Sequence, residues 1–141
     1  MKFTEFAVGQ VIEAEPYAVT EAEVIDFATP YDPQWFQTDP HAASRGRFGG
    51  LIASGWQTCG IAMRLVADAA LHGSESFASP GLAYVKWPGP CAPTVLETRT
   101  ARSQPTLGIL RWRWQLFNAG GVEVLDLEAT SLFALDPATT P

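Results

Sequence analysis

The chain has 141 residues, of which 47% are hydrophobic and 17% are charged. This composition predicts one ordinary globular domain over residues 1–141 and excludes the disordered, collagen-like and low-complexity classes. Nine basic residues against fifteen acidic ones give a formal charge of -6 at pH 7. That sign is wrong for a protein that neutralises nucleic-acid or lipid phosphates. We therefore expect neither a nucleic-acid partner nor a membrane partner.

Metal binding and export are also disfavoured. Two cysteines and two widely spaced histidines cannot supply a zinc ligand set, so no metal site is expected. The first ten residues have no apolar run behind their single lysine, which favours a cytoplasmic protein. The most apolar stretch, residues 51–71, is interrupted by Gln57, Arg64 and Asp68, which favours a buried soluble helix over a membrane span.

The first predicted helix begins after Thr20. Thr20 and Glu23 form a capping-box pattern, and Pro30 is expected to end the helix because proline disfavours helical angles in the residue before it. Residues 31–48 then read as a long loop, in which Asp39 can cap one helical turn opened by Pro40. Loops of this length inside a compact domain are usually functional.

A second, longer helix is the most distinctive predicted element. Ser54 is a candidate N-cap, the helix runs from Gly55 to about Leu71, and Gly73 is its expected stop. Apolar residues cover most of its circumference, which predicts burial on nearly all sides.

Strand-like segments fill the second half of the chain. They are residues 82–87, 95–102, 107–117 and 122–134, where apolar and polar residues alternate most clearly in the third. Residues 118–121, with sequence Asn-Ala-Gly-Gly, are suited to a hairpin turn. The predicted fold class is α+β, with one long central helix packed along a curved antiparallel sheet.

Three stretches carry a resemblance to a known family. They are residues 31–40 (YDPQWFQTDP), 48–56 (FGGLIASGW) and 111–114 (RWRW). They resemble MaoC-like acyl dehydratases of the (R)-specific enoyl-CoA hydratase type, and the likeness runs from about Phe6 to Phe133. The resemblance implies the hotdog fold, in which a sheet wraps a central helix, and a homodimer or dimer of dimers. It implies acyl thioesters of coenzyme A or of a carrier protein as substrates, with no cofactor apart from the coenzyme A of the substrate.

The family's hydratase signature falls on residues 32–37. It consists of Asp, any residue, Asn, Pro, an apolar residue and His, so Asp32 matches and Gln37 replaces the catalytic histidine. His41 lies nine residues after Asp32 rather than five and is not the equivalent residue.

The resemblance implies that Asp32 and residue 37 hold the water that adds to C3 of an enoyl thioester. The aromatic surroundings of Asp32 can raise its pKa toward that of a useful base, although an Asx turn before Pro33 is the simpler interpretation. Gln37 can orient water but cannot exchange a proton near neutral pH. The backbone N–H of Gly55, at a helix start, can stabilise the enolate oxygen, unless glycine is needed there only for close packing.

The expected substrate contacts surround these three residues. Trp35 and Phe36 can wall an acyl pocket, although a role in the core is the more ordinary one for large aromatic residues. Arg45 and Arg47 can pair with coenzyme A phosphates, or can simply be solvated. The expected set is Trp35, Phe36, Arg45, Arg47, Phe48, Ser54 and Trp56.

Three functions therefore compete. The first is a hydratase or dehydratase, a lyase of fatty acid metabolism, which the overall match favours. The second is an acyl-CoA thioesterase that uses the same helix end, and the third is a non-catalytic acyl-thioester-binding subunit whose partner supplies the histidine. The replaced histidine favours the second and third.

Overall fold

The computed structural model describes residues 1–88, 94–101 and 104–135. The chain forms two compact units, one made of residues 1–15 and 64–141 and the other of residues 16–63. The single domain over residues 1–141 stays a prediction, and we describe each unit by itself.

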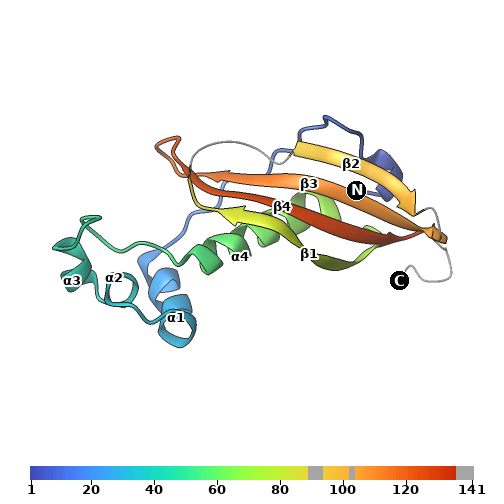
Figure 1. Ribbon diagram of the computed structural model, residues 1–141. Helices are drawn as coiled ribbons and strands as arrows, with labels where there is room; N and C mark the ends of the chain where they lie inside the picture. The colour runs from blue at the N-terminus through green and yellow to red at the C-terminus, as the bar shows by residue number, and fades with distance from the viewer. Residues whose placement is uncertain (89–93, 102–103, 136–141) are drawn as a thin grey trace. The chain divides into compact units, whose positions relative to one another are not determined.

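A four-stranded antiparallel sheet dominates the first unit (Figure 1). Its strands are β1 (Ser76–Lys86), β2 (Thr94–Ala101), β3 (Gln104–Phe117) and β4 (Glu123–Ala134), in the order β1-β4-β3-β2. Each predicted strand is present. Trp87 falls outside β1 and Val122 falls outside β4, and Arg102 lies outside the described residues. The α+β class is confirmed.

The two faces of β3 differ as the alternating sequence predicts. Leu110, Trp112 and Trp114 are buried on one face. The opposite face carries charge, because Arg111 and Arg113 bind Glu128 and Asp126 of β4 at 2.8 and 2.7 Å. The turn between these strands is the predicted hairpin turn. In it the side-chain oxygen of Asn118 accepts the backbone N–H groups of Gly120 and Val122 at 2.9 and 3.0 Å.

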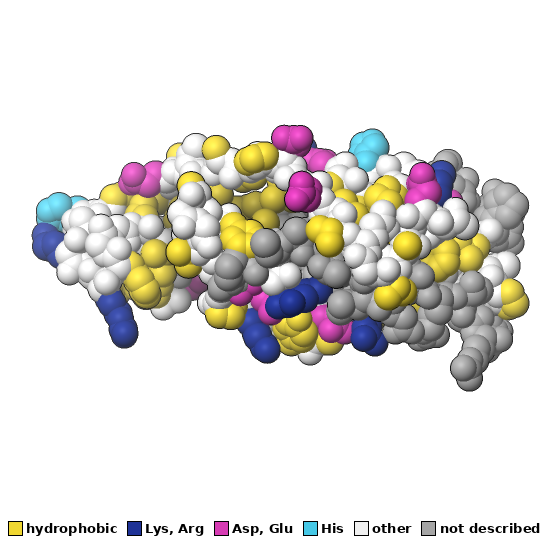
Figure 2. Space-filling model, turned by 90° about the horizontal axis from the view of Figure 1, so that it is seen from above, with side chains coloured by type: hydrophobic (Ala, Val, Ile, Leu, Met, Phe, Trp, Pro, Cys, Tyr) yellow, Lys and Arg dark blue, Asp and Glu magenta, His cyan; other side chains and the backbone are white. Residues whose placement is uncertain are grey.

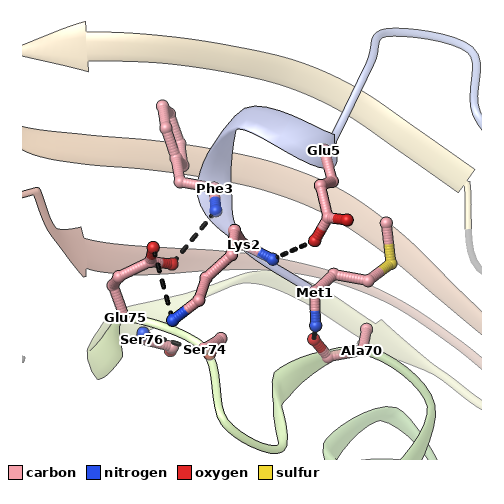
Figure 3. A network of polar contacts seen from close by, with 8 residues as sticks. All are labelled: Met1, Lys2, Phe3, Glu5, Ala70, Ser74, Glu75 and Ser76. Atoms are coloured by element: carbon pink, nitrogen blue, oxygen red, sulfur yellow. Dashed lines mark hydrogen bonds and ion pairs between the residues drawn. The ribbon is translucent and has the colours of Figure 1, made fainter. Parts of the chain in front are cut away.

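An N-terminal turn, η1 (Phe3–Glu5), packs on this sheet. The ring of Phe3 lies 5.3 Å from that of Phe133, centroid to centroid. The carboxylate of Glu75 accepts the Phe3 N–H at 3.1 Å and lies 3.7 Å from the Lys2 ammonium (Figure 3). Gly108 of β3 approaches Phe3 so closely that a Cβ at Gly108 would lie 2.8 Å from the ring.

The second unit begins with α1 (Glu21–Tyr31). The capping box is present, because Thr20 Oγ1 accepts the Glu23 N–H at 3.2 Å and the Glu23 carboxylate accepts the Thr20 N–H at 2.8 Å. The predicted stop at Pro30 is wrong, since the helix includes Pro30 in its last turn. There proline removes one backbone hydrogen bond, and the Asp32 N–H still bonds to the Ala28 carbonyl at 2.8 Å.

Two short helices occupy the stretch predicted as a loop. One is α3 (Pro40–Ser44), which begins as expected with Asp39 accepting the Ala42 N–H at 2.9 Å. The other is α2 (Trp35–Thr38), which the sequence analysis missed because Gln34 caps it with no side-chain hydrogen bond. Helices of four or five residues give too little periodicity to detect.

The long helix is present as α4 (Gly55–Val66), continued by a π-helical turn, η2 (Ala67–Leu71). Gly73 follows with a positive φ of 69°, as its predicted role requires. Burial on nearly all sides is wrong for this chain, because Trp56 and Met63, seven residues apart on one face, are 62% and 41% exposed. In the described parts of the chain, no helix combines the length and the apolar character that a bilayer crossing requires.

We predict that the protein is at least a homodimer. Figure 2 shows hydrophobic side chains on the visible surface. Trp56 and Met63 of α4 are exposed, as are Phe77 and Leu82 on β1, which is an edge strand. Such apolar surface favours association. Sedimentation at micromolar concentration should give at least twice the chain mass of 15.3 kDa; a monomer alone would contradict the prediction.

Gly108→Ala should lower the stability of the protein by about 1–3 kcal/mol, because the added Cβ would overpack against Phe3. The matched control is Gly60→Ala in α4, where an added Cβ would meet no described atom within 4 Å apart from its chain neighbours and the backbone of its own helix. Because alanine favours a helix by ~1 kcal/mol over glycine, the control should not destabilise. Thermal and urea unfolding of both variants measure the difference, and equal destabilisation would contradict the packing argument.

Candidate active site

The second unit brings Asp32, Gln37 and Ser54 together around one carboxylate. Asp32 Oδ2 accepts a hydrogen bond from the Gln37 amide at 2.8 Å and another from the Ser54 hydroxyl at 2.7 Å. Asp32 Oδ1 accepts a third from the amide of Gln34 at 2.8 Å. The predicted contact between Asp32 and Gln37 is therefore present as a direct hydrogen bond.

Local structure explains why these residues meet. Asp32 follows α1 with φ and ψ of -153° and 65°, so the chain leaves the helix there. The Gln34 N–H bonds back to the Asp32 carbonyl at 2.8 Å, which starts the turn into α2 and its Gln37. The segment that leads to α4 is fixed to α2 in turn, because the Ile52 N–H bonds to the Phe36 carbonyl at 3.3 Å. Ser54 thereby reaches Asp32 from 22 residues away in sequence.

Gln37 is only 2% exposed and uses one end of its amide. Its Nε2 donates to Asp32, whereas its Oε1 accepts no hydrogen bond from any described residue. The opposite orientation of the amide would place its oxygen against a carboxylate, so the network fixes the orientation. A buried acceptor without a donor costs about 1–3 kcal/mol. Gln37 Oε1 is therefore suited to accept a hydrogen bond from water or from a hydroxyl group of a ligand.

The pKa of Asp32 is lowered rather than raised. Hydrogen bonds from Gln34, Gln37 and Ser54 lower it, and they outweigh desolvation, which raises it. The expectation of a raised pKa is wrong, because the nearest groups are polar donors that favour the ionised carboxylate. Asp32 is thus a fixed negative charge near neutral pH and a weaker base than an ordinary aspartate.

Gly55 lies at the first position of α4, directly after Ser54. Ser54 is 2% exposed, and its carbonyl accepts the Thr58 N–H at 3.0 Å, so it is the residue from which the helix starts. The positive end of the α4 dipole therefore lies beside the Asp32 carboxylate. This placement agrees with the predicted position of Gly55, and its role toward an enolate oxygen stays a prediction.

Most of the aromatic residues in the expected substrate set are exposed. Trp35, Phe48 and Trp56 are 52%, 64% and 62% exposed, so a core role is wrong for them. They belong to a short helix, a loop and a helix start, where a side chain has neighbours on one side only. Phe36 is half-buried and meets the Trp35 ring edge to face, with centroids 5.4 Å apart.

The two expected arginines, Arg45 and Arg47, are both exposed. The Arg45 Nη1 atom lies 3.2 Å from both ring nitrogens of His41 on α3. His41 thus contacts Arg45 and makes no hydrogen bond to Asp32, in agreement with its position outside the signature.

Sequence reasoning missed two residues of the site. Gln34 occupies the position of the signature's Asn, and its retained amide group was the available signal for a contact with Asp32. Gln57 of α4 donates to the Glu23 carbonyl at 3.1 Å and ties α4 to α1. It is 7% exposed, and its Oε1 accepts no hydrogen bond from the described residues. A lone glutamine in an apolar helix gave no distinctive signal.

Comparison with known proteins gives a consistent family assignment. A family model described as MaoC like domain matches residues 3–102. The uncharacterized protein YdeM of Bacillus subtilis (strain 168) is 31% identical over 140 aligned residues, which cover 94% of this chain and 98% of that protein.

Solved structures agree with this match. The MaoC-like dehydratase from Rhodospirillum rubrum is 30% identical, with a TM-score of 0.83 over 95% of this chain and 97% of that chain. The unliganded R-hydratase PhaJ1 from Pseudomonas aeruginosa has a TM-score of 0.70 over 95% of this chain and 86% of that chain. At 20% identity, the second likeness bears on the fold alone.

Ser54→Ala should raise the pKa of Asp32, because it removes one of the three donors that hold the carboxylate ionised. The acid limb of any Asp32-dependent activity should then move to higher pH. Carbon-13 NMR titration of the aspartate carboxyl groups, with the Asp32 signal assigned by its loss in Asp32→Asn, measures the shift. Ser44→Ala is the control, since its hydroxyl bonds to the His41 carbonyl. An unchanged or lowered pKa in Ser54→Ala would refute the assignment of donors.

Proposed function

The chain belongs to the MaoC-like dehydratase family and has the hotdog fold, and on that premise we propose that it is an acyl-thioester hydratase/dehydratase. The reaction is the reversible addition of water to a trans-2-enoyl-CoA-like substrate. The observation that carries the proposal is the Asp32 carboxylate, held by Gln37 and Ser54 at the start of α4. This addition requires a base and a group that stabilises negative charge on the thioester oxygen. The Asp32 carboxylate and the N-terminus of α4 can supply them.

Each group has a defined task in the proposed reaction. Water lies between Asp32 and the Oε1 atom of Gln37, and Oε1 accepts a hydrogen bond from it. As the water oxygen bonds to C3, Asp32 takes its other proton, and the negative charge that moves to the thioester oxygen is stabilised at the α4 N-terminus near Gly55. Asp32 then returns the proton to C2, so that water is added across the double bond and the carboxylate is regenerated.

One consequence concerns stereochemistry. A single carboxylate that both takes and returns the proton stays on one face of the substrate, so the hydrogen and the hydroxyl add to that face. Gln37 keeps the hydrogen-bonding function of the family histidine but not its proton exchange. Together with the lowered pKa of Asp32, this predicts a slow hydratase.

A second candidate, an acyl-CoA thioesterase, is favoured by the chemistry of the Asp32 contacts. Its hydrogen-bond partners Gln34, Gln37 and Ser54 do not exchange protons near neutral pH. Hydrolysis needs only a base to activate water, because a thiolate with a pKa of about 8.5 leaves without an acid. The third candidate, a non-catalytic acyl-thioester-binding subunit, predicts binding of the thioester without turnover.

One assay separates the three candidates. A trans-2-enoyl-CoA substrate is followed at two wavelengths, one for loss of the conjugated enoyl band and one for released thiol. Loss of the band without thiol supports the hydratase, thiol release supports the thioesterase, and binding with neither signal supports the non-catalytic subunit. A homodimer of the kind predicted above is the form to assay.

Gln37→His should raise the hydration rate for a short trans-2-enoyl-CoA, because it restores a proton-exchanging group in a similar volume. The gain should not exceed the ~10² to 10⁴ that one acid-base group contributes, since the surrounding residues suit an amide. Asp32→Asn should abolish activity. Steady-state kinetics over several acyl chain lengths is the measurement.

Gln34→His is the matched control, because it places a histidine beside the same carboxylate but outside the family position. It should give no comparable gain. If Gln37→His changes nothing while the wild type releases thiol readily, the hydratase assignment gives way to the thioesterase.

A further inference from the structure

Gln57 is a buried glutamine to which the proposed reaction assigns no task. It is 7% exposed and lies in the first turn of α4, three residues after Ser54. Its Nε2 atom donates to the backbone carbonyl of Glu23 in α1 at 3.1 Å. Because the acceptor belongs to the main chain, the bond does not depend on the ionisation of the Glu23 carboxylate. Gln57 therefore joins the start of α4 to the first turn of α1.

Packing alone does not explain a glutamine at this position. The Oε1 atom of Gln57 is buried and accepts no hydrogen bond from the described residues. A buried acceptor without a donor lowers stability, whereas an apolar side chain of similar volume would fill the same space without that cost. An apolar side chain cannot donate to the Glu23 carbonyl, however. The bond to α1 is therefore the property that distinguishes glutamine here.

Ser54 lies between two contacts that fix the chain around it. Two residues earlier, the Ile52 N–H bonds to the Phe36 carbonyl of α2 at 3.3 Å. Three residues later, Gln57 bonds to α1. The segment that carries the Ser54 hydroxyl is thus attached to one helix on each side of Ser54.

Gln57 and Ser54 contact α1 at its two ends. Gln57 bonds to Glu23 in the first turn of α1, and the Ser54 hydroxyl bonds at 2.7 Å to Asp32, which directly follows the helix. Residues three apart on a helix lie on one face, so one side of the α4 start carries both donors. Loss of the Gln57 bond would release the Glu23 end of α1 from α4, and the Asp32 carboxylate could then move relative to Ser54.

We propose that Gln57 is a positioning residue for Asp32 and acts through Ser54. The inference rests on the proposed function, since it concerns the carboxylate to which that function assigns the proton transfers. By fixing α1 against the start of α4, Gln57 keeps the Asp32 carboxylate within reach of the Ser54 hydroxyl. It contacts neither the water nor the thioester of the proposed reaction. Gln57 therefore affects the rate through the geometry of Asp32 and not through binding of the thioester.

Gln57→Met tests the proposal, because it removes the donor at nearly the same side-chain volume. It loses one hydrogen bond and one unsatisfied acceptor, so urea unfolding should show little change in stability. The pKa of Asp32 should rise, by no more than in Ser54→Ala, because the bond from Ser54 weakens. Carbon-13 NMR titration measures the rise. The described groups that bond to the Asp32 carboxylate are uncharged, so their own titration does not affect this measurement.

The double variant Ser54→Ala/Gln57→Met tests whether Gln57 acts through Ser54. Once the Ser54 hydroxyl is absent, Gln57→Met should raise the pKa of Asp32 no further. Effects that add in the double variant would overturn the proposal. Thr58→Val is the matched control, because its hydroxyl bonds at 3.1 Å to the Ser54 carbonyl, within α4 itself. It should leave the pKa of Asp32 unchanged, and a rise equal to that of Gln57→Met would show that the bond to α1 is not the cause.

Steady-state kinetics with a short trans-2-enoyl-CoA gives the second measurement. Gln57→Met should lower kcat by about tenfold to a hundredfold and leave KM unchanged, since misplacement of a reacting group by a fraction of an ångström slows the chemical step. If the wild type hydrates the thioester but Gln57→Met leaves either kcat or the pKa of Asp32 unchanged, the positioning role is overturned and the proposed function stands. If the pKa rises as expected while the wild type turns over no thioester, the positioning of Asp32 is supported and the proposed function is not.

Discussion

The Asp32 carboxylate and its three hydrogen bonds hold the candidate active site together. Its donors come from different parts of the second unit: Gln34 precedes α2, Gln37 lies within α2, and Ser54 precedes α4. An ionised carboxylate satisfied by several donors has few alternative arrangements. One side chain therefore contacts the residue before α2, a residue within α2 and the residue before α4. The chemistry proposed for the site depends on that same group, so structure and reactivity are linked through one residue.

Sequence reasoning succeeded where a signal is local. The capping box at Thr20, the turn at Asn118 and the alternation in β3 depend on residues close together in sequence, and all are present. It failed where side-chain directions or distant residues decide the outcome. The pKa of Asp32 is lowered by the amides of Gln34 and Gln37, whose directions the sequence does not show, and by a hydroxyl 22 residues away. The exposure of Trp56 depends on which face of α4 is covered. The site could be located from Asp32 and Gln37, but its electrostatics could not.

The exchange of histidine for Gln37 separates two properties that the family motif combines. An amide keeps the geometry, because Nε2 still donates to the carboxylate at 2.8 Å. It loses proton exchange, so the proposed reaction requires Asp32 both to take and to return a proton. On the proposed function, the site thus keeps the carboxylate and its hydrogen-bond partner while its acid-base capacity is reduced. A replacement that keeps the hydrogen-bond donor to Asp32 can therefore lower the reaction rate without changing how the site is assembled.

The low pKa of Asp32 also limits what the site can hold. Because the carboxylate stays ionised near neutral pH, any ligand that brings its own carboxylate to this position meets a like charge at short range. A thioester carbonyl is neutral and meets no such repulsion. On the proposed function, the site should therefore discriminate by charge at the acyl head, so that free fatty acids are poor competitors and a carboxylic acid formed there is repelled.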